Sequence, residues 1–353
     1  MITSNPMTPY IVTSIALTLA LAGCTKGQDD TLLLPNEKHL RNIRQLTHGG
    51  ENAEAYLSFS GTQLVFQSSR DSFQCDQIFT MDIDGGNVAL KSTGIGRTTC
   101  AYFLPGDTTI LYSSTHSGGP ECPPNPDYSK GYVWAIYPSF EIYVRGIGRG
   151  EPRVLNAAPG YDAEATVSPL GDRIVFTSSR DNDLELYSMN LDGTGLVRLT
   201  HEIGYDGGAF YSADGKKIVY RAGHPKDSAG IEDFKELLRT GLVRPSVMEL
   251  FVMNADGSGK RQITNLGTAS FAPYFHPDGN TIIFASNCKD PKGRNFDLFL
   301  VKTDGTGMEQ VTFNDTFDGF PVFTADGKHL IFASNRNAKV RGETNVFIAD
   351  WVP

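Results

Sequence analysis

Charged and imidazole side chains recur in two registers along this sequence of 353 residues. Both registers are counted from a short apolar run that occurs six times. Each run begins at a turn residue and ends in an aromatic residue five positions later. Nine residues before the turn residue lie Asn52, Thr98, Asp162, Asp206, Ser270 and Asp318, and four residues after the aromatic residue lie Arg70, His116, Arg180, His224, Cys288 and Arg336. We expect both sets to gather at one mouth of a repeated structure.

These registers and their neighbours supply the candidate ligand-binding residues, which are Glu54, His116, Asp162, Glu164, Arg180, Asp206, His224, Asp318 and Arg336. The first interpretation is structural, because Asp162 with Arg180, and Asp318 with Arg336, can form charge-assisted hydrogen bonds that tie strand ends together. The second is a polar funnel for a peptide terminus or a cation. Two histidines and scattered carboxylates do not match a metal site, so we expect no resident cofactor. A divalent cation in the channel is the one alternative left open.

The elements that position these residues belong to a sixfold repeat, whose period indicates a closed repeat architecture. The apolar runs are Gly61 to Phe66, Asp107 to Tyr112, Gly171 to Phe176, Gly215 to Tyr220, Gly279 to Phe284 and Gly327 to Phe332. Their Ile, Val, Leu and aromatic content predicts strands. Each is followed by another strand, then in four copies by an Asp-Gly turn and a further strand. The calcium-loop alternative for these turns lacks the spaced carboxylates and bidentate Glu of an EF-hand.

The last copy ends before its outermost strand. A matching segment, Asn42 to Thr47, stands before the first copy and resembles Lys260 to Thr264. Pairing the two ends of the chain in one sheet would close a ring and remove its open edges. The sequence therefore predicts an all-β fold, a six-bladed β-propeller of four-stranded blades over residues 41–353, with an N-terminal strand completing the last blade.

The pattern Phe-x-Ser-x-Arg, an Asp-Gly-x-Gly turn and then Leu-Thr resembles the TolB-type propeller repeat. The resemblance implies a non-catalytic scaffold of the cell envelope that binds a protein or peptide. Such repeats are specific for fold and unspecific for activity. The alternative is a hydrolase or polysaccharide lyase at the channel mouth, with His116, His224 and nearby carboxylates as acid and base. We expect no attached hydrolase domain, because no Gly-x-Ser-x-Gly motif is present.

Two long links, residues 113–139 and 222–247, are predicted to insert at one mouth of the channel. The second contains Ile231, Phe234, Leu237 and Leu238 on one face of a short helix. Long insertions on one rim of a repeat fold are often a binding face. The alternative is a plug that only stabilises the ring.

The N-terminal residues predict export and lipid attachment. An apolar stretch, Ile11 to Leu21, is too short to span a bilayer but suits a signal peptide. It leads into Leu21-Ala22-Gly23-Cys24, which resembles a bacterial lipobox, although residues 1–23 contain no Lys or Arg. The resemblance implies a signal peptide over 1–23, lipid on Cys24, a tether over 24–40, and an outer-membrane anchor that leaves the protein periplasmic or surface-facing.

Cysteines and net charge complete the expectations. An oxidising compartment permits disulfides, and Cys100 is expected to pair with Cys75 or Cys122, with Cys75 and Cys100 as the assigned pair. Cys288 is expected to remain unpaired. The formal charge of −9, without a cluster of Lys and Arg, excludes an ordinary nucleic-acid-binding surface.

Overall fold

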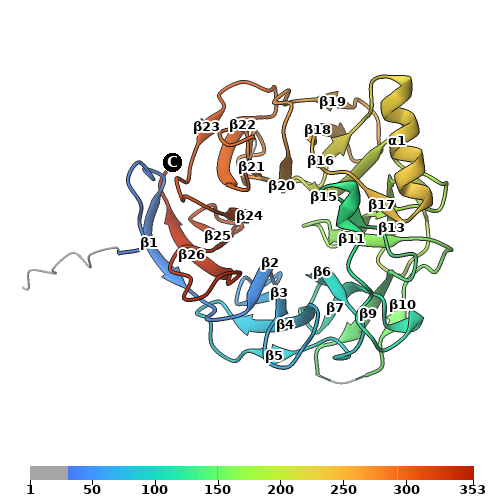
Figure 1. Cartoon of the computed structure of the whole chain (residues 1–353). Helices are drawn as coiled ribbons and strands as arrows, with labels where there is room; N and C mark the ends of the chain where they lie inside the picture. The colour runs from blue at the N-terminus through green and yellow to red at the C-terminus, as the bar shows by residue number, and fades with distance from the viewer. Residues whose placement is uncertain (1–30, 149, 292) are drawn as a thin grey trace, which may run out of the picture.

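The computed structural model describes residues 31–148, 150–291 and 293–353. These residues form six antiparallel four-stranded sheets set around a central axis, which confirms the predicted propeller (Figure 1). From the channel outward, blade 1 consists of β2 (Glu51–Leu57), β3 (Gln63–Ser69), β4 (Gln77–Asp82) and β5 (Ala89–Leu90), and blade 2 consists of β6 (Thr98–Phe103), β7 (Thr109–Ser114), β9 (Glu141–Gly146) and β10 (Arg153–Val154). Blade 3 consists of β11 (Asp162–Val167), β12 (Arg173–Ser178), β13 (Glu185–Asn190) and β14 (Val197–Arg198), and blade 4 consists of β15 (Tyr205–Tyr211), β16 (Lys217–Gly223), β18 (Glu249–Asn254) and β19 (Arg261–Gln262). Blade 5 consists of β20 (Ser270–Phe275), β21 (Thr281–Ser286), β22 (Asp297–Lys302) and β23 (Glu309–Gln310), and blade 6 consists of β24 (Asp318–Phe323), β25 (His329–Ser334), β26 (Asn345–Trp351) and β1 (Leu40–Gln45).

The repeated motif stabilises each blade. In blade 3, the Arg180 guanidinium lies 5.4 Å from the centre of the Phe176 ring, and its Nε donates to Ser178 Oγ at 2.8 Å. These contacts explain why Phe, Ser and Arg occur together. The threonine that ends the motif, preceded by Leu199, Ile263 or Val311 in these copies, acts at the outer edge, where its hydroxyl accepts a backbone N–H of the third strand. The distance is 2.8 Å for Leu186 to Thr200, Leu250 to Thr264 and Leu298 to Thr312.

The two ends of the described chain meet in blade 6. Strand β1 pairs antiparallel with β26, with Leu40 opposite Trp351 and Gln45 opposite Phe347. In Figure 1 the blue β1 lies beside the red β26. This pairing is the predicted closure, and it leaves neither blade 1 nor blade 6 with an incomplete sheet. The predicted signal peptide and Cys24 lie outside the described residues.

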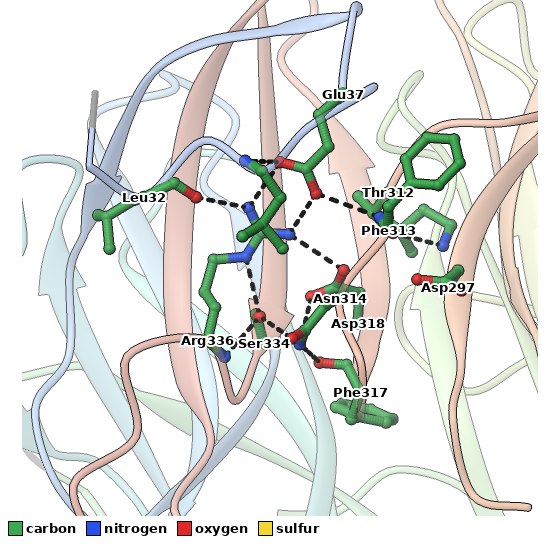
Figure 2. A network of polar contacts seen from close by, with 12 residues as sticks. Leu32, Glu37, Asp297, Thr312, Phe313, Asn314, Phe317, Asp318, Ser334 and Arg336 are labelled. Carbon is green, nitrogen blue, oxygen red and sulfur yellow. Dashed lines mark hydrogen bonds and ion pairs between the residues drawn. The ribbon is translucent and has the colours of Figure 1, made fainter. Parts of the chain in front are cut away.

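Residues 31–39, expected to belong to a polar tether, contact blades 5 and 6. Leu32 and Leu33 pack against the core of these blades, and Glu37 is buried. Figure 2 shows Glu37 facing Arg336, whose Nη2 lies 2.9 Å from Glu37 Oε1 and 3.0 Å from Asp318 Oδ2. Arg336 Nη1 also donates to the Leu32 carbonyl at 3.2 Å. We call Leu32, Glu37, Asp318 and Arg336 the clasp, because they fasten the N-terminal segment to the last blade.

The two inserts fold together over one mouth of the channel, the upper mouth, where the inner strands begin. They contribute η1 (His116–Gly118), η2 (Tyr128–Lys130), β8 (Trp134–Ala135), α1 (Ser228–Arg239) and β17 (Leu242–Val243). Strands β8 and β17 pair with each other, although they come from blades 2 and 4. The predicted helix is present as α1 and buries Phe234 and Leu237. We call this unit the cap.

A disulfide joins Cys75 to Cys122, with their Cα atoms 6.0 Å apart. Both expected pairings of Cys100, with Cys75 and with Cys122, were therefore wrong, because Cys100 is free. Cys288 is free as expected. Cys100 belongs to an inner strand, where its backbone turns it toward the channel, while Cys75 lies in the link between β3 and β4. The disulfide fastens the cap to the neighbouring blade. Within the described residues, no helix is long and apolar enough to cross a membrane.

Candidate functional site

Every inner strand carries a β-bulge at the same place. The register against the second strand shifts in each blade, for example between Ala53 and Tyr56 in blade 1 and between Ala163 and Thr166 in blade 3. One residue in each bulge has a left-handed backbone, with φ between 48° and 58°. These residues are Glu54, Cys100, Glu164, Gly208, Ala272 and Phe320. We call them the bulge ring. Bulges re-aim side chains and are common beside functional sites.

The bulge ring surrounds a small central cavity. All six of its residues line the cavity, together with Tyr56, Thr166, Phe210 and Arg221. Its volume is about 30 Å³. A cavity of this volume has room for about two water molecules or one small ion. The channel centre is therefore a site for a small group and has no space for a sugar ring or a folded peptide.

Aromatic side chains close the channel on the side of the cavity away from the upper mouth. Tyr56 of blade 1 and Phe210 of blade 4 belong to opposite blades, yet their ring centres are only 5.5 Å apart. Tyr102 and Tyr274 extend this contact, at 5.3 Å from Tyr56 and Phe210 respectively. Because these rings meet across the axis, the cavity is a blind pocket and the ring is not an open pore.

One wall of the cavity is a buried ion pair. Arg221 Nη2 donates to Glu164 Oε1 at 2.5 Å, and the Tyr205 hydroxyl lies 2.7 Å from both carboxylate oxygens. Thr177 Oγ1 and the backbone N–H of Gly208 each donate to Glu164 Oε2 at 2.9 Å. Glu164 is thus fully hydrogen-bonded in a charge-assisted network.

Aromatic rings enclose the cationic partner of this pair. The Arg221 guanidinium lies 5.4 Å from the ring centres of Trp134 and Tyr205, and 5.6 Å from that of Phe271. Trp134 belongs to β8, so the cap reaches down to the channel. Two glycines make room for the cluster. A Cβ at Gly208 would lie 2.4 Å from Arg221 Nη1, and one at Gly207 would lie 2.3 Å from Glu164 Oε2.

Another wall holds the carboxyl group of Glu54, which forms no ion pair among the described residues and is hydrogen-bonded to the Cys100 thiol. Among the described residues, Glu54 Oε2 is buried and has no hydrogen-bond partner. Burial and the charge of Glu164 raise the pKa of Glu54 to about 7, while neighbouring Cys100 and Arg221 oppose this shift. Burial likewise raises the pKa of the Cys100 thiol. Near neutral pH, Glu54 can therefore be either protonated or charged.

Of the predicted ligand-binding residues, the structure brings only Glu54 and Glu164 to the cavity. Six others form three pairs within their own blades: Arg180 with Asp162 at 2.9 Å, His224 with Asp206 at 3.0 Å, and Arg336 with Asp318 at 3.0 Å. Burial raises the pKa of Asp206 to about 6, which the bond from His224 opposes. His116 Nδ1 lies 2.8 Å from Ser114 Oγ, beside the Tyr143 ring. These contacts are the structural alternative of the sequence analysis.

Sequence reasoning missed Arg221 and Cys100 as cavity residues. Arg221 occupies the variable position of the Phe-x-Ser-x-Arg motif, where the other copies have Gln67, Ser113, Thr177, Ala285 and Ala333. It is the only charged residue there, and the pair Gly207-Gly208 lies on the adjacent strand. A comparison of the copies at this position would have found it. Among the residues that the structure describes, no group of three or more His, Cys, Asp or Glu side chains is placed to hold a metal ion.

No protein-family model matches the sequence. An uncharacterized protein of Agrobacterium fabrum is 28% identical over 162 residues, which cover 44% of this chain and 48% of that protein. The Tol-Pal system protein TolB of Anaeromyxobacter dehalogenans is 31% identical over 130 residues, 37% of this chain and 25% of that protein. The chain thus spans less than half the length of these curated relatives.

Solved structures share the fold at low sequence identity. A putative TolB from Agrobacterium tumefaciens has a TM-score of 0.55 at 18% identity and covers 88% of this chain and 97% of its own. TolB from Acinetobacter baumannii has a TM-score of 0.54 at 15% identity and covers 85% and 63%. An oligogalacturonate lyase in complex with manganese has a TM-score of 0.51 at 14% identity and covers 88% and 93%. Together with the repeat motif, these similarities identify the fold of the chain as a six-bladed β-propeller of the kind found in the TolB structures.

Proposed function

We propose that this protein is a binding module of the cell envelope that holds a protein or peptide partner at its capped rim. It is attached to the outer membrane through lipid on Cys24 and faces the periplasm or the cell surface. It acts as a scaffold and not as a catalyst. The similarity to TolB proteins supports the general role of a propeller that binds partners in the envelope.

The observation that carries this proposal is the construction of the cap. Two links from different blades form one folded unit, through the β8–β17 pair and the Cys75–Cys122 disulfide. A plug would bury its aromatic residues, but the cap leaves Tyr132 at 55% exposure and Tyr128 at 60%. Exposed tyrosines on a rigid support are typical of protein-binding surfaces, since they add contact area with little loss of side-chain entropy.

Site-specific photo-crosslinking in cells tests the proposal. A photoreactive phenylalanine analogue replaces Tyr132 on the cap or, as the matched control, Leu170, which is 60% exposed in the turn between β11 and β12 at the opposite mouth. We expect a discrete adduct from position 132 and none from position 170. Adducts from both positions, or from neither, would contradict a partner site on the capped rim. A Cys24→Ser variant in the same cells should lose its membrane attachment.

A second candidate function is the hydrolase or polysaccharide lyase at the channel mouth. The observation in its favour is Glu54, whose pKa of about 7 suits proton transfer near neutral pH. The cavity of about 30 Å³ does not admit a sugar ring, so this function would require the cap to move. Formation of unsaturated product from polygalacturonate, with and without added manganese, tests it. Turnover that is lost in Glu54→Gln would favour the enzyme over the scaffold.

A further inference from the structure

The two carboxylates of the bulge ring have the same backbone and opposite surroundings. Glu164 and Glu54 both have a left-handed φ, 58° and 52°, and both face the cavity. Glu164 has a resident cation in Arg221 and four different hydrogen-bond donors. Glu54 forms no ion pair among the described residues; its carboxyl group is hydrogen-bonded to the Cys100 thiol, and its Oε2 is buried without a partner. Buried carboxylates in proteins are usually paired. Buried carboxyl oxygens without a partner among the described residues belong to Glu54, Glu141, Glu185, Asp206 and Asp297, and of these only that of Glu54 lines the cavity.

The left-handed backbone at Glu54 recurs at the same position in all six blades, so it comes from the shared bulge. What differs between the blades is the side chain that the bulge turns toward the cavity. Blade 4 has Gly208 there, blade 5 has Ala272 and blade 6 has Phe320. Blade 1 places a glutamate at this position, which adds the unfavourable burial of its charge.

Aromatic side chains border the cavity, and a row of aromatic rings connects it to the rim. Tyr56, Phe210 and Phe320 line the cavity itself. A continuous row of half-buried rings extends toward the cap, with centres 5.1 Å apart for Trp134 and Phe271, 5.3 Å for Phe271 and Phe296, and 6.3 Å for Phe296 to Phe317 and for Phe317 to Phe320. Arg221 already uses three rings of this region to hold its charge. A second cation beside Glu54 would find similar surroundings.

We propose that the cavity binds one ammonium group, with Glu54 as its counter-ion and the faces of Tyr56, Phe210 and Phe320 as its walls. The volume of about 30 Å³ suits an ammonium group and excludes a larger headgroup. The group is either a free ion or the end of a lysine side chain that enters past the aromatic row. Only the lysine source rests on the proposed function, because the cavity binds the charge whatever carries it.

Binding should depend on pH. The groups that act on Glu54 are the Cys100 thiol, the Glu164 carboxylate, the Arg221 guanidinium and, at longer range, Asp76. Only the ionised carboxylate of Glu54 attracts a cation, and its pKa is about 7. The ionised fraction rises about tenfold between pH 6 and pH 8, so the affinity should rise by about the same factor.

Titration of the propeller with two probes tests the proposal. Butylammonium represents a lysine side chain and ammonium chloride represents the free ion, and binding is followed by saturation-transfer NMR and calorimetry. We expect saturable binding of butylammonium that weakens at least about tenfold in Glu54→Gln. Glu51→Gln, an exposed site on the same strand, should bind as the native protein does. A Phe320→Ala variant should weaken binding by a smaller factor, about threefold, through loss of one aromatic wall.

Each outcome bears on the proposal. Binding of ammonium chloride but not butylammonium assigns the site to a free ion. No saturable binding of either probe at pH 8, or equal binding by a folded Glu54→Gln protein, overturns it. Thermal melting of each variant shows whether it is folded. A negative crosslinking result at Tyr132 with positive butylammonium binding would refute the capped-rim partner and leave this site standing.

Discussion

Two buried arginines, Arg336 in the clasp and Arg221 in the channel, have similar surroundings but differ in how fully their hydrogen bonds are satisfied. Both guanidinium groups lie over aromatic rings, Arg336 at 5.0 Å from the centre of the Phe332 ring and Arg221 at 5.4 Å from that of Trp134. Both join segments that are distant in the sequence. Arg336, however, pairs with two carboxylates, Glu37 and Asp318, whereas within the described part of the chain Arg221 pairs with Glu164 alone.

The difference lies in how completely the hydrogen bonds are satisfied. Around Arg336, the carboxylates of Glu37 and Asp318, the Leu32 carbonyl and Ser334 Oγ all accept from the guanidinium (Figure 2). Around Arg221, by contrast, the buried Nε has no partner among the described residues, and Glu54, whose Oε2 also lacks one, lines the same cavity. Beside the clasp, Asp297 Oδ1 is likewise without a partner among the described residues, and burial together with Asp318 and Glu37 raises the pKa of Asp297 to about 7. The Arg336 guanidinium itself is saturated and stabilises the fold, whereas the unsaturated Arg221 and Glu54 line a cavity where a ligand can complete their hydrogen bonds.

The largest effect should follow from Arg336→Met. The change leaves Glu37 and Asp318 buried, close together and without a cation, and breaking a buried ion pair in this way costs about 4 kcal/mol. Urea unfolding followed by tryptophan fluorescence measures the loss, because Trp351 stacks on His39 beside the clasp, at 5.0 Å between ring centres.

The matched control is Lys339→Met, an exposed cation three residues along the chain. It should change the free energy of unfolding by less than about 0.5 kcal/mol. A loss below about 1 kcal/mol in Arg336→Met would show that the N-terminal segment is not held by the clasp.

A smaller effect should follow from Arg221→Met, which sharpens the comparison. Glu164 would keep the hydroxyls of Tyr205 and Thr177 and the N–H of Gly208, so its desolvation would be partly compensated. We expect a loss of about 3 kcal/mol in the free energy of unfolding. The fluorescence of Trp134, on whose ring Arg221 lies, should also change.

Arg239→Met provides the control for this variant, since Arg239 lies on α1 with 73% of its side chain exposed and pairs only with Glu236. Surface ion pairs of this kind contribute less than about 1 kcal/mol. If Arg221→Met were more harmful than Arg336→Met, the distinction between a saturated and an unsaturated cluster would not hold.

The sequence predicted the fold well because each blade obeys local rules that repeat. The turn residue, the apolar run and the Leu-Thr pair recur, and the N-terminal strand is a copy of the outer strand that the last blade lacks. Asp162 with Arg180 and Asp318 with Arg336 were found in the same way, since both partners belong to one copy.

The cavity could not be predicted with the same rules. A bulge inserts one residue into each inner strand, and a shift of one residue reverses which side chains face the channel. Counting from the turns therefore led to Asp206 and Asp318, which are buried and paired with His224 and Arg336 away from the cavity lining, and gave no reason to single out Cys100. Glu37 was missed because its partner Arg336 is 299 residues away and the repeat contains no copy of the clasp.

The smallest expected effect is a gain in stability, and it tests the unsaturated cluster directly. The pKa of Glu54 is about 7 in the folded protein against 4.5 in the unfolded chain, because burial disfavours its charge. The stability that its protonated form contributes is fully present below pH 4.5 and is lost as the pH rises through 7. Glutamine copies the protonated acid, so Glu54→Gln should match the native protein near pH 4 and be more stable by about 2 kcal/mol at pH 6. Urea unfolding at the two pH values measures this, with Glu232→Gln on the exposed face of α1 as the control that should change neither. Equal stability at pH 6 would mean that Glu54 already has a counter-ion, whereas a gain coupled to lost ammonium binding would show stability given up for a binding site.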